Sequence, residues 1–521
     1  MAQTIARSAA IIMVVTLVGR VVGLFREMLL ANQFGANYLA DAYTLGFTIP
    51  STIFLFIPGA LNAIFVPSIK SMLVRNRKEE AESLFKKVLS LTVILYLIIT
   101  IIGMFFSKEL VIALSKGEFK GIELQTATLI MQIMWPSAVF IALIGVFQST
   151  LNAHQMFFIP TLSTVVNSIV VCAAYPLLVP FYGIYGVAAG TTIGFAFAAF
   201  TMLPAVRREK YPLQIDFKWN TPEMKKIGER FLPIMLGSFV TQIYSFIYPF
   251  LASGLGEGKL ASLRYANNLY QLPMAIFVAA FTLPIFPYLV EYFTNGQLAK
   301  MKASITEGMQ YLFILMVPTI TAMVVMPDQL VSLIYHFGKH SEFTSASVKL
   351  TSTALIYMSA GLFFLAARDL LTRAFYAMEK TKITVIAAIA GIISNILASV
   401  VLIPFLGHGG IALGTSVGSL VNMLWLAYYL RKDIGAFIGQ PFWITAGKTI
   451  AASCIMGVVL YLGTVFTFQS LFIQKVYTLA VIAAGAAAFF AAMVMLREQL
   501  AVRIIERFTG KLTRKRLKEE G

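Results

Sequence analysis

The sequence predicts an all-α integral membrane protein with about fourteen transmembrane helices: two six-helix pseudo-symmetric lobes and two C-terminal helices. Three observations predict this fold class: the composition, the number of long apolar segments, and an internal repeat. Of 521 residues, 58% are apolar and 12% are charged, whereas a typical soluble domain has roughly 25% charged residues. The mean hydropathy is +0.80. These values exclude a soluble globular enzyme and a disordered protein.

Long apolar segments recur along the whole chain. A helix that crosses a bilayer needs about 20 predominantly apolar residues. Fourteen segments meet this requirement, at residues 8–32, 39–70, 86–106, 124–151, 157–180, 183–206, 231–253, 262–290, 307–326, 347–377, 383–404, 409–430, 445–467 and 474–496. The first is not expected to be a cleaved signal peptide, because Arg20 interrupts its apolar run and no small-residue cleavage site follows.

Lysine and arginine are distributed unequally between the two sides of the membrane. With the N-terminus in the cytoplasm, 30 of the 41 basic residues fall on the cytoplasmic side and seven on the opposite side, while four lie within or at the ends of helices. Because cytoplasmic loops of membrane proteins are enriched in these residues, both termini are predicted to be cytoplasmic. Loops that face anionic lipid then explain the net charge of +17, and we expect no nucleic-acid partner.

An internal repeat divides the chain. Residues 180–194 and 404–418 match at eight of fifteen positions, at an offset of 224. The predicted organisation is an N-terminal six-helix lobe at 1–206, a C-terminal six-helix lobe at 207–432, two further helices at 433–497, and a basic cytoplasmic tail at 498–521. Since an even number of crossings gives both copies the same orientation, an axis along the membrane normal should relate them, with a cavity between them.

Charged side chains inside the first apolar segment are candidate functional residues. Arg20 lies near the middle of this segment, and Arg26 and Glu27 lie in its outer third. Each charge costs about 2.5–3.5 kcal/mol at the bilayer centre, so it should face a cavity or a partner. We expect Arg20 and Arg26 to bind substrate and Glu27 to contribute to gating. The alternatives are a structural bond between helices for Arg20, and snorkelling to the interface for the other two residues.

Two polar stripes follow apolar helices that are equivalent in the repeat. They consist of Asp41, Thr44, Thr48 and Ser51 in segment 39–70, and of Arg264, Asn267, Asn268 and Gln271 in segment 262–290. Such a stripe is typical of a wall that lines a wet cavity. We expect Arg264, Asn268 and Gln271 to bind substrate. Asp41 and Arg264 are expected to pair and close the outer side, with Arg26 as a second candidate partner of Asp41. The alternative is polar contact between packed helices.

We find no catalytic, cofactor or metal-binding motif in the sequence. Cys172 and Cys454 lie in apolar runs, and the four histidines are scattered singly, whereas a metal site needs three or four converging ligands. The segment GLGEGKL (254–260) lacks the GxxxxGK[ST] spacing of a phosphate-binding loop and is expected to be a loose external loop. We therefore expect a transporter and not an enzyme, driven by ions, membrane potential or the substrate gradient.

Several stretches carry a resemblance to a known family. They are GRVVGLFREMLLANQFGANYLADAY (19–43), FVPSI (65–69), FGK (337–339), YMSAGL (357–362) and RAFYAMEKTK (373–382). The chain resembles the MurJ/MviN family, the bacterial lipid II flippases of the MOP exporter superfamily. The resemblance implies the two-lobe fold with two extra helices, numbers 13 and 14, whose groove admits a polyprenyl tail. It also implies movement of an undecaprenyl-diphosphate-linked peptidoglycan precursor from the inner to the outer leaflet of the bacterial cytoplasmic membrane.

The resemblance assigns roles to individual residues. Arg20 and Arg26 match the family's functional arginines, and Asp41 matches its functional acid. At two positions where the family often carries arginine, this chain has Phe54 and Asn268. The cavity is therefore expected to be less cationic than is usual. Arginine binds phosphate oxygens bidentately and stays charged, which suits a diphosphate substrate.

The sequence leaves two alternative functions open. One is a flippase for another polyprenyl-diphosphate-linked oligosaccharide, and the other is a cation-coupled multidrug exporter of the same superfamily. An exporter of cationic drugs should have an acidic cavity, whereas the interior charges here are more basic. The expected partners are the polyprenyl-diphosphate lipid, membrane lipids and a possible coupling ion, and we expect a monomer.

Overall fold

The computed structural model describes residues 2–338 and 340–508, so Lys339 of the FGK motif and residues 509–521 of the predicted tail lie outside the described residues. Within these ranges every regular element is helical and no strand is present. The predicted all-α class is confirmed.

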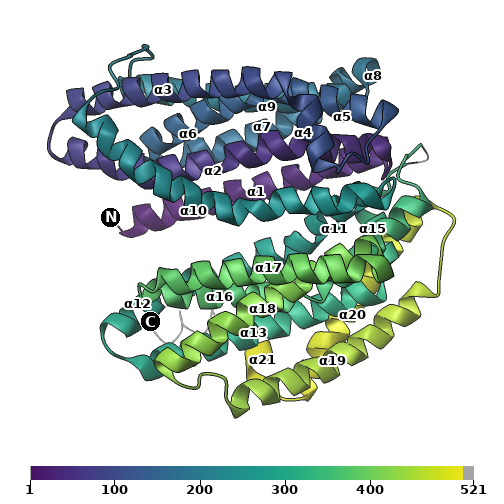
Figure 1. Ribbon diagram of the computed structural model, residues 1–521. Coiled ribbons are helices and arrows are strands. Elements are labelled where there is room, and N and C mark those ends of the chain that lie inside the picture. Colours follow the sequence, from purple (N-terminus) through teal and green to yellow (C-terminus); the bar gives the residue numbers. More distant parts are fainter. Residues whose placement is uncertain (1, 339, 509–521) are drawn as a thin grey trace. The chain divides into compact units, whose positions relative to one another are not determined.

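The chain divides into two compact units, Met1–Ala261 and Ser262–Gly521 (Figure 1). The helices of the first unit are α1 (Ala2–Phe34), α2 (Tyr38–Val74), α3 (Lys78–Phe105), α4 (Ser107–Leu114), α5 (Gly121–Met134), α6 (Ser137–Ala153), α7 (Phe158–Leu177), α8 (Val179–Tyr182), α9 (Ile184–Arg208), α10 (Pro222–Ala252) and the 3-10 turn η1 (Ser253–Leu255). Helix α11 (Lys259–Pro273) begins in the first unit and continues into the second.

The second unit holds the remaining helices. They are the π-helical turn η2 (Met274–Val278), α12 (Ala279–Thr294), α13 (Leu298–Val325), α14 (Pro327–Tyr335), α15 (Ser345–Ser359), α16 (Leu362–Ala377), α17 (Thr381–Leu406), α18 (His408–Ile434), α19 (Gln440–Thr464), α20 (Leu471–Met495) and α21 (Gln499–Phe508).

Helix α10 belongs to the first compact unit because it packs along α2, with smaller contacts to α3 and α4. Along the chain, the boundary between the two compact units therefore falls between residues 261 and 262. The predicted boundary between the lobes, at residues 206 and 207, rests on the sequence repeat and stays a prediction.

Nine helical segments in the described part of the chain are long and apolar enough to cross a membrane. They are Lys78–Phe105, Gly121–Ala153, Phe158–Leu177, Ile184–Arg208, Leu298–Val325, Thr381–Leu406, His408–Ile434, Gln440–Thr464 and Leu471–Met495. The pair α15 and α16 bends by 46° and gives a tenth span if it is counted as one. The protein is thus a multi-pass membrane protein, as predicted, while the number fourteen stays a prediction.

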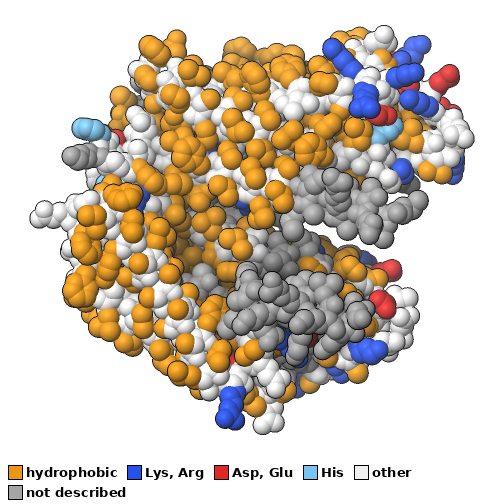
Figure 2. All heavy atoms as spheres, turned by 180° about the vertical axis from the view of Figure 1, so that it is seen from behind, with side chains coloured by type: hydrophobic (Ala, Val, Ile, Leu, Met, Phe, Trp, Pro, Cys, Tyr) orange, Lys and Arg blue, Asp and Glu red, His pale blue; other side chains and the backbone are white. Residues whose placement is uncertain are grey.

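Exposed apolar side chains mark the surfaces that face lipid. Figure 2 shows hydrophobic side chains over much of the visible face of the first unit, the upper part of the view, with charged side chains gathered at one end. On α3, Leu91, Leu95, Ile98 and Ile102 follow one another at helical spacing and are 37–52% exposed. A soluble protein rarely leaves such a continuous apolar stripe in water, so this face suits a bilayer.

The internal repeat makes the same kind of helix contact in each unit. Gly190 of α9 packs on Ala174 of α7, and Gly414, at the equivalent position in α18, packs on Ser399 of α17. A Cβ atom at either glycine would overlap its neighbour. Small residues allow membrane helices to approach closely. Gly190 and Gly414, which are equivalent in the repeat, therefore allow the same close helix packing in each unit.

The last two long helices, α19 and α20, pack with α13 inside the second unit. Their common core includes Tyr311, Ile314, Met456, Leu460, Phe489 and Met493. At one end of this contact, the Gln310 amide donates hydrogen bonds to the Pro441 carbonyl oxygen and to the Thr445 hydroxyl, both at 3.0 Å. This packing fixes the position of α20, which carries part of a pocket considered below.

Candidate functional site

Helix α1 places its three candidate charged residues in different surroundings. Gly19 lies against α7, where a Cβ atom would come within 3.3 Å of a methyl group of Val165. Arg20, the next residue, is exposed. Further along, Arg26 donates from Nη2 to Oε1 of Glu27 at 3.0 Å, and the Glu27 side chain is only 7% exposed. Arg26 and Glu27 thus form a partly buried ion pair, whereas Arg20 presents its charge at the surface.

The start of α2 is held by two acceptors. Asn37 is the N-cap residue, and its side-chain oxygen accepts hydrogen bonds from the backbone N–H groups of Leu39 and Ala40. The free N–H groups of a first helical turn need such acceptors. Another acceptor comes from far along the chain, because Oε1 of Glu257 accepts from the backbone N–H of Tyr38 at 3.1 Å. The loop before α11 is thereby attached to the start of α2.

Asp41 makes the reciprocal connection from α2 to the start of α11. Its side chain is buried at 4% exposure. One carboxylate oxygen accepts from the backbone N–H of Gly258 at 2.5 Å, and the other accepts from that of Ala261 at 2.7 Å. A carboxylate is stabilised at a helix N-terminus by the free N–H groups and the helix dipole. Asp41 therefore acts as a long-range cap of α11.

Gly258 is required for this arrangement. Its φ of +76° favours glycine, and a Cβ atom there would overlap the carbonyl oxygen of Ala36. The sequence prediction of a loose loop at 254–260 is wrong, because Glu257, Gly258 and Ala261 all bind the start of α2. A glycine directly before a helix start, preceded by an acid, was the available signal for an anchored turn.

A small acidic cavity lies beside Asp41 in the first unit. Its volume is about 150 Å³, and its ionisable lining residues are Asp41, Glu118, Glu123 and Glu257. A diphosphate would be repelled there, so this cavity does not suit the headgroup of a polyprenyl-diphosphate lipid. Among the described residues, no group of three or more His, Cys, Asp or Glu side chains is arranged to hold a metal ion.

The rest of the α2 stripe bonds to its own helix. The hydroxyls of Thr44 and Thr48 donate to the carbonyl oxygens of Ala40 and Thr44 at 2.8 Å, and Ser51 donates to Thr48 at 3.2 Å. All three side chains are buried, at 7–8% exposure. Their polarity is therefore satisfied inside the helix and does not require a wet cavity.

The predicted residues of the second stripe lie in the second unit. Arg264 and Asn268 are half-buried, and Gln271 is exposed. The side-chain nitrogen of Asn268 has no hydrogen-bond partner among the residues that the structure describes. A pairing of Asp41 with Arg264 would join residues of the two units and stays a prediction.

Comparisons with known proteins agree over nearly the whole chain. The family model of the lipid II flippase MurJ matches residues 30–485. A probable lipid II flippase MurJ of Buchnera aphidicola subsp. Acyrthosiphon pisum is 27% identical over 474 residues, which cover 89% of this chain and 92% of the relative.

Two solved structures have a similar fold. A lipid II flippase MurJ in an inward closed conformation has a TM-score of 0.77 and 24% identity, covering 93% of this chain and 99% of that protein. An inward-facing multidrug resistance MATE family transporter of the MOP superfamily has a TM-score of 0.66 and 16% identity, covering 82% of this chain and 98% of that protein. At these identities the two structures show the fold alone.

Proposed function

The chain belongs to the lipid II flippase MurJ family, and from this premise we propose that it moves lipid II from the inner to the outer leaflet of the bacterial cytoplasmic membrane by alternating access. The observation that carries the proposal is the family match across residues 30–485, which includes helices of both units. It favours lipid II over multidrug export and over other polyprenyl-diphosphate oligosaccharides, the two alternatives that the sequence left open.

The proposed topology has fourteen membrane spans with both termini in the cytoplasm. Ten spans correspond to the helices that meet the length and hydropathy requirement, with α15 and α16 counted together. The other four are α1, α2, α10 and the α11–α12 segment, which coincide with the remaining predicted apolar segments. The excess of basic residues in the predicted cytoplasmic loops supports this orientation. The lobes at 1–206 and 207–432, the helices at 433–497, the coupling ion and the monomeric state belong to the same proposal.

The diphosphate of the substrate is proposed to interact with Arg20 and Arg264, and with Arg26 when its bond to Glu27 opens. Asn268 and Gln271 supply further polar groups on α11. The exposure of Arg20 supports this role, because its guanidinium can be approached by a ligand. Arginine carries a permanent charge and a planar array of donors, which compensates for the cost of placing a diphosphate away from water.

Asp41 and Glu27 are proposed to control the opening of the cavity on the outer side of the membrane. Asp41 bonds the start of α11 directly, so opening at this point must break two charge-assisted hydrogen bonds. Such bonds can hold a closed state and be replaced by water in an open one. Asp41 is therefore proposed as a latch, and the pairing with Arg264 would add to it.

The proposal is tested in cells that depend on this chain for lipid II transport, by measuring lipid II accessibility on the outer surface during its depletion. We expect external lipid II to fall at least fivefold while total lipid II accumulates. The Arg20→Ala variant should reproduce the loss and Arg20→Lys should restore part of it. Arg431→Ala is the matched control, because Arg431 is exposed at the last turn of α18. Unchanged external lipid II on depletion would refute the proposal.

A further inference from the structure

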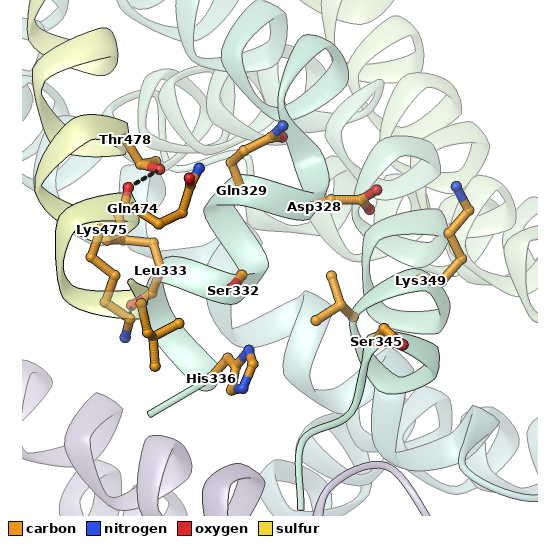
Figure 3. A pocket seen from close by; sticks show the side chains of 12 residues that line it. Asp328, Gln329, Ser332, Leu333, His336, Ser345, Lys349, Gln474, Lys475 and Thr478 are labelled. Carbon is orange, nitrogen blue, oxygen red and sulfur yellow. Dashed lines mark hydrogen bonds between the residues drawn. The ribbon is translucent and has the colours of Figure 1, made fainter. Parts of the chain in front are cut away.

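A second cavity lies in the second unit, away from the residues discussed so far. Its volume is about 430 Å³, which is within the range of ligand pockets. It is formed by α14, the start of the next helix α15, and the first two turns of α20, which lies much later in the sequence (Figure 3). Its polar lining consists of Asp328, Gln329, Ser332, His336, Ser345, Lys349, Gln474, Lys475 and Thr478.

Lys475 is a half-buried cation of this pocket. Its ammonium donates to the carbonyl oxygen of Leu333 at 2.9 Å and lies 3.3 Å from the centre of the Phe337 ring. Three N–H groups are present on an ammonium, and the bond to Leu333 uses one of them. Lys349, the other lysine of the lining, is exposed on α15. The Lys475 ammonium therefore has N–H groups beyond the one bonded to Leu333 that it can donate to an anionic ligand.

The remaining groups favour a singly charged anion. Asp328 is the only carboxylate among the lining residues and leaves a net charge of +1 with the two lysines. Figure 3 shows His336 and Lys475 toward one end of the pocket and Asp328 on another side. Burial and the charge of Lys475 lower the pKa of His336, so its imidazole is neutral at pH 7 and serves as a hydrogen-bonding group. The first turn of α15, at Ser345, adds the positive end of a helix dipole.

The surroundings of Lys475 point to an amphipathic ligand. On the same turns of α20, Phe472, Ile473, Val476 and Leu479 are 50–76% exposed. These apolar side chains lie at the start of a helix that is apolar enough to span the membrane. A ligand whose anion reaches Lys475 can therefore lay its hydrocarbon part along the apolar face of the same helix.

We propose that this pocket binds the phosphate of a membrane lipid headgroup at Lys475, while Lys349, on the side of Asp328 in Figure 3, adds positive charge to the pocket. The lipid belongs to the leaflet in which α20 begins, which is the outer leaflet under the proposed orientation. The site is distinct from the proposed arginine site on α1 and α11, and it goes beyond the movement of lipid II. Seated beside the first turns of α20, a bound lipid would hold α14, α15 and α20 together.

The test uses the full-length protein in nanodiscs with a photo-crosslinkable phosphatidylglycerol that carries its diazirine near the headgroup. We expect labelling of peptides that contain residues 328–349 and 471–479. Lys475→Gln and Ser345→Asp should each reduce this labelling at least fivefold. A diacylglycerol probe with the same chains and diazirine should label these peptides at least fivefold less, because it lacks the phosphate.

The variants are chosen to separate binding from folding. Lys475→Gln also removes the bond to Leu333, whereas Ser345→Asp adds a repelling charge at an exposed position where an acid suits the helix dipole. Lys108→Gln, an exposed lysine of the first unit, is the matched control and should label as the parent does. Equal labelling in the parent, Lys475→Gln and Ser345→Asp would overturn the proposal. Displacement of the lipid probe by an equal concentration of inorganic phosphate would also overturn it, in favour of a free-phosphate site. Neither result depends on lipid II transport.

Discussion

The two units share their helix packing but hold their charges differently. In the first unit, Asp41 is buried and accepts hydrogen bonds from the backbone N–H groups of Gly258 and Ala261, and Glu27 is paired with Arg26. In the second, the adjacent pair Arg368 and Asp369 is 34% and 35% exposed, and Lys475 lines an open pocket. The close helix contacts made by the repeat are therefore present in both units, whereas the surroundings of the charged side chains differ between the units.

The largest expected effect tests the shared packing. Gly190→Leu and Gly414→Leu should each lower stability severely. A Cβ at residue 190 overlaps the Cβ of Ala174, which no rotamer can move, and a Cβ at residue 414 overlaps the Ser399 hydroxyl and comes within 2.9 Å of the Asn395 carbonyl oxygen. Overpacking usually costs about 1–3 kcal/mol, and these sites belong at or above the top of that range. The yield of monodisperse protein and its thermal midpoint measure the effect.

A rescue and a control sharpen this test. Ala174→Gly should recover part of the loss in Gly190→Leu, because Ala174 supplies the overlapping Cβ. Gly447→Leu is the matched control, since a Cβ there meets no neighbour within 4 Å. If one of the two glycines accepts leucine without loss, the copies do not share their packing.

The ion pairs provide the second comparison. Arg26→Gln removes the positive charge that pairs with Glu27, whose side chain is only 7% exposed. Arg368→Gln removes the positive charge that pairs with Asp369, whose side chain is 35% exposed. We expect about 2 kcal/mol of destabilisation in the first case and under about 1 kcal/mol in the second. Thermal unfolding in one detergent measures both. Equal losses would show that burial does not distinguish the pairs, and Glu27→Gln added to Arg26→Gln should restore stability.

The latch provides the third test. Asp41→Asn keeps the size of the side chain but loses the charge and one acceptor for the N–H groups of Gly258 and Ala261. A loss of about 1–2 kcal/mol in unfolding free energy is expected, together with reduced external lipid II. Glu342→Gln, at an exposed position of the second unit, is the control. Wild-type stability in Asp41→Asn would contradict its role as a cap of α11.

The smallest expected effect concerns pH. Burial lowers the pKa of His154, the charges of Lys78 and Lys70 lower it further, and Glu209 opposes them. His154 contacts Glu209 at 3.3 Å and the Tyr211 hydroxyl at 3.0 Å. The folded state binds a proton at His154 less tightly than the unfolded state does. The contribution of neutral His154 to folding stability is therefore complete above the ordinary pKa of 6.5 and is lost as pH falls below it.

This loss should be about 0.5 kcal/mol at most, because the imidazole is partly exposed to screening solvent. Thermal midpoints of the parent and of His154→Gln between pH 7.5 and 5.5 measure it, and the variant should depend less on pH. His336 of the second unit also has a lowered pKa, through burial and Lys475, so His336→Gln should act in the same direction. If the thermal midpoint of either variant falls more steeply with decreasing pH than that of the parent, the two histidines do not reduce stability at low pH as expected.

Composition and helical spacing were sufficient to predict a membrane bundle, because the length of an apolar segment is set directly by the thickness of the bilayer. The repeat was visible because its glycines are needed at one contact in each copy. The meaning of single polar residues was harder to predict. Thr44, Thr48 and Ser51 have the spacing of a cavity wall, yet their hydroxyls bond to carbonyl groups of their own helix.

Two features could not be predicted because they depend on contacts between distant segments. The anchored turn at Gly258 requires Asp41, more than 200 residues earlier in the chain. The pocket at Lys475 combines side chains of α14, α15 and α20, which in the sequence are isolated residues in predicted external loops or at the outer ends of the predicted segments 347–377 and 474–496. The spacing of residues within one helix carries no information about contacts with distant segments.

The connection between Asp41 and Gly258 also limits where the protein can be engineered. Although residues 254–258 form a short turn rich in glycine, an epitope tag or a fluorescent insertion there would separate both helix starts from their acceptors. An insertion that follows Gly296 and keeps this glycine is a better choice, because its φ of +68° favours glycine while a Cβ atom there would meet no neighbour within 4 Å.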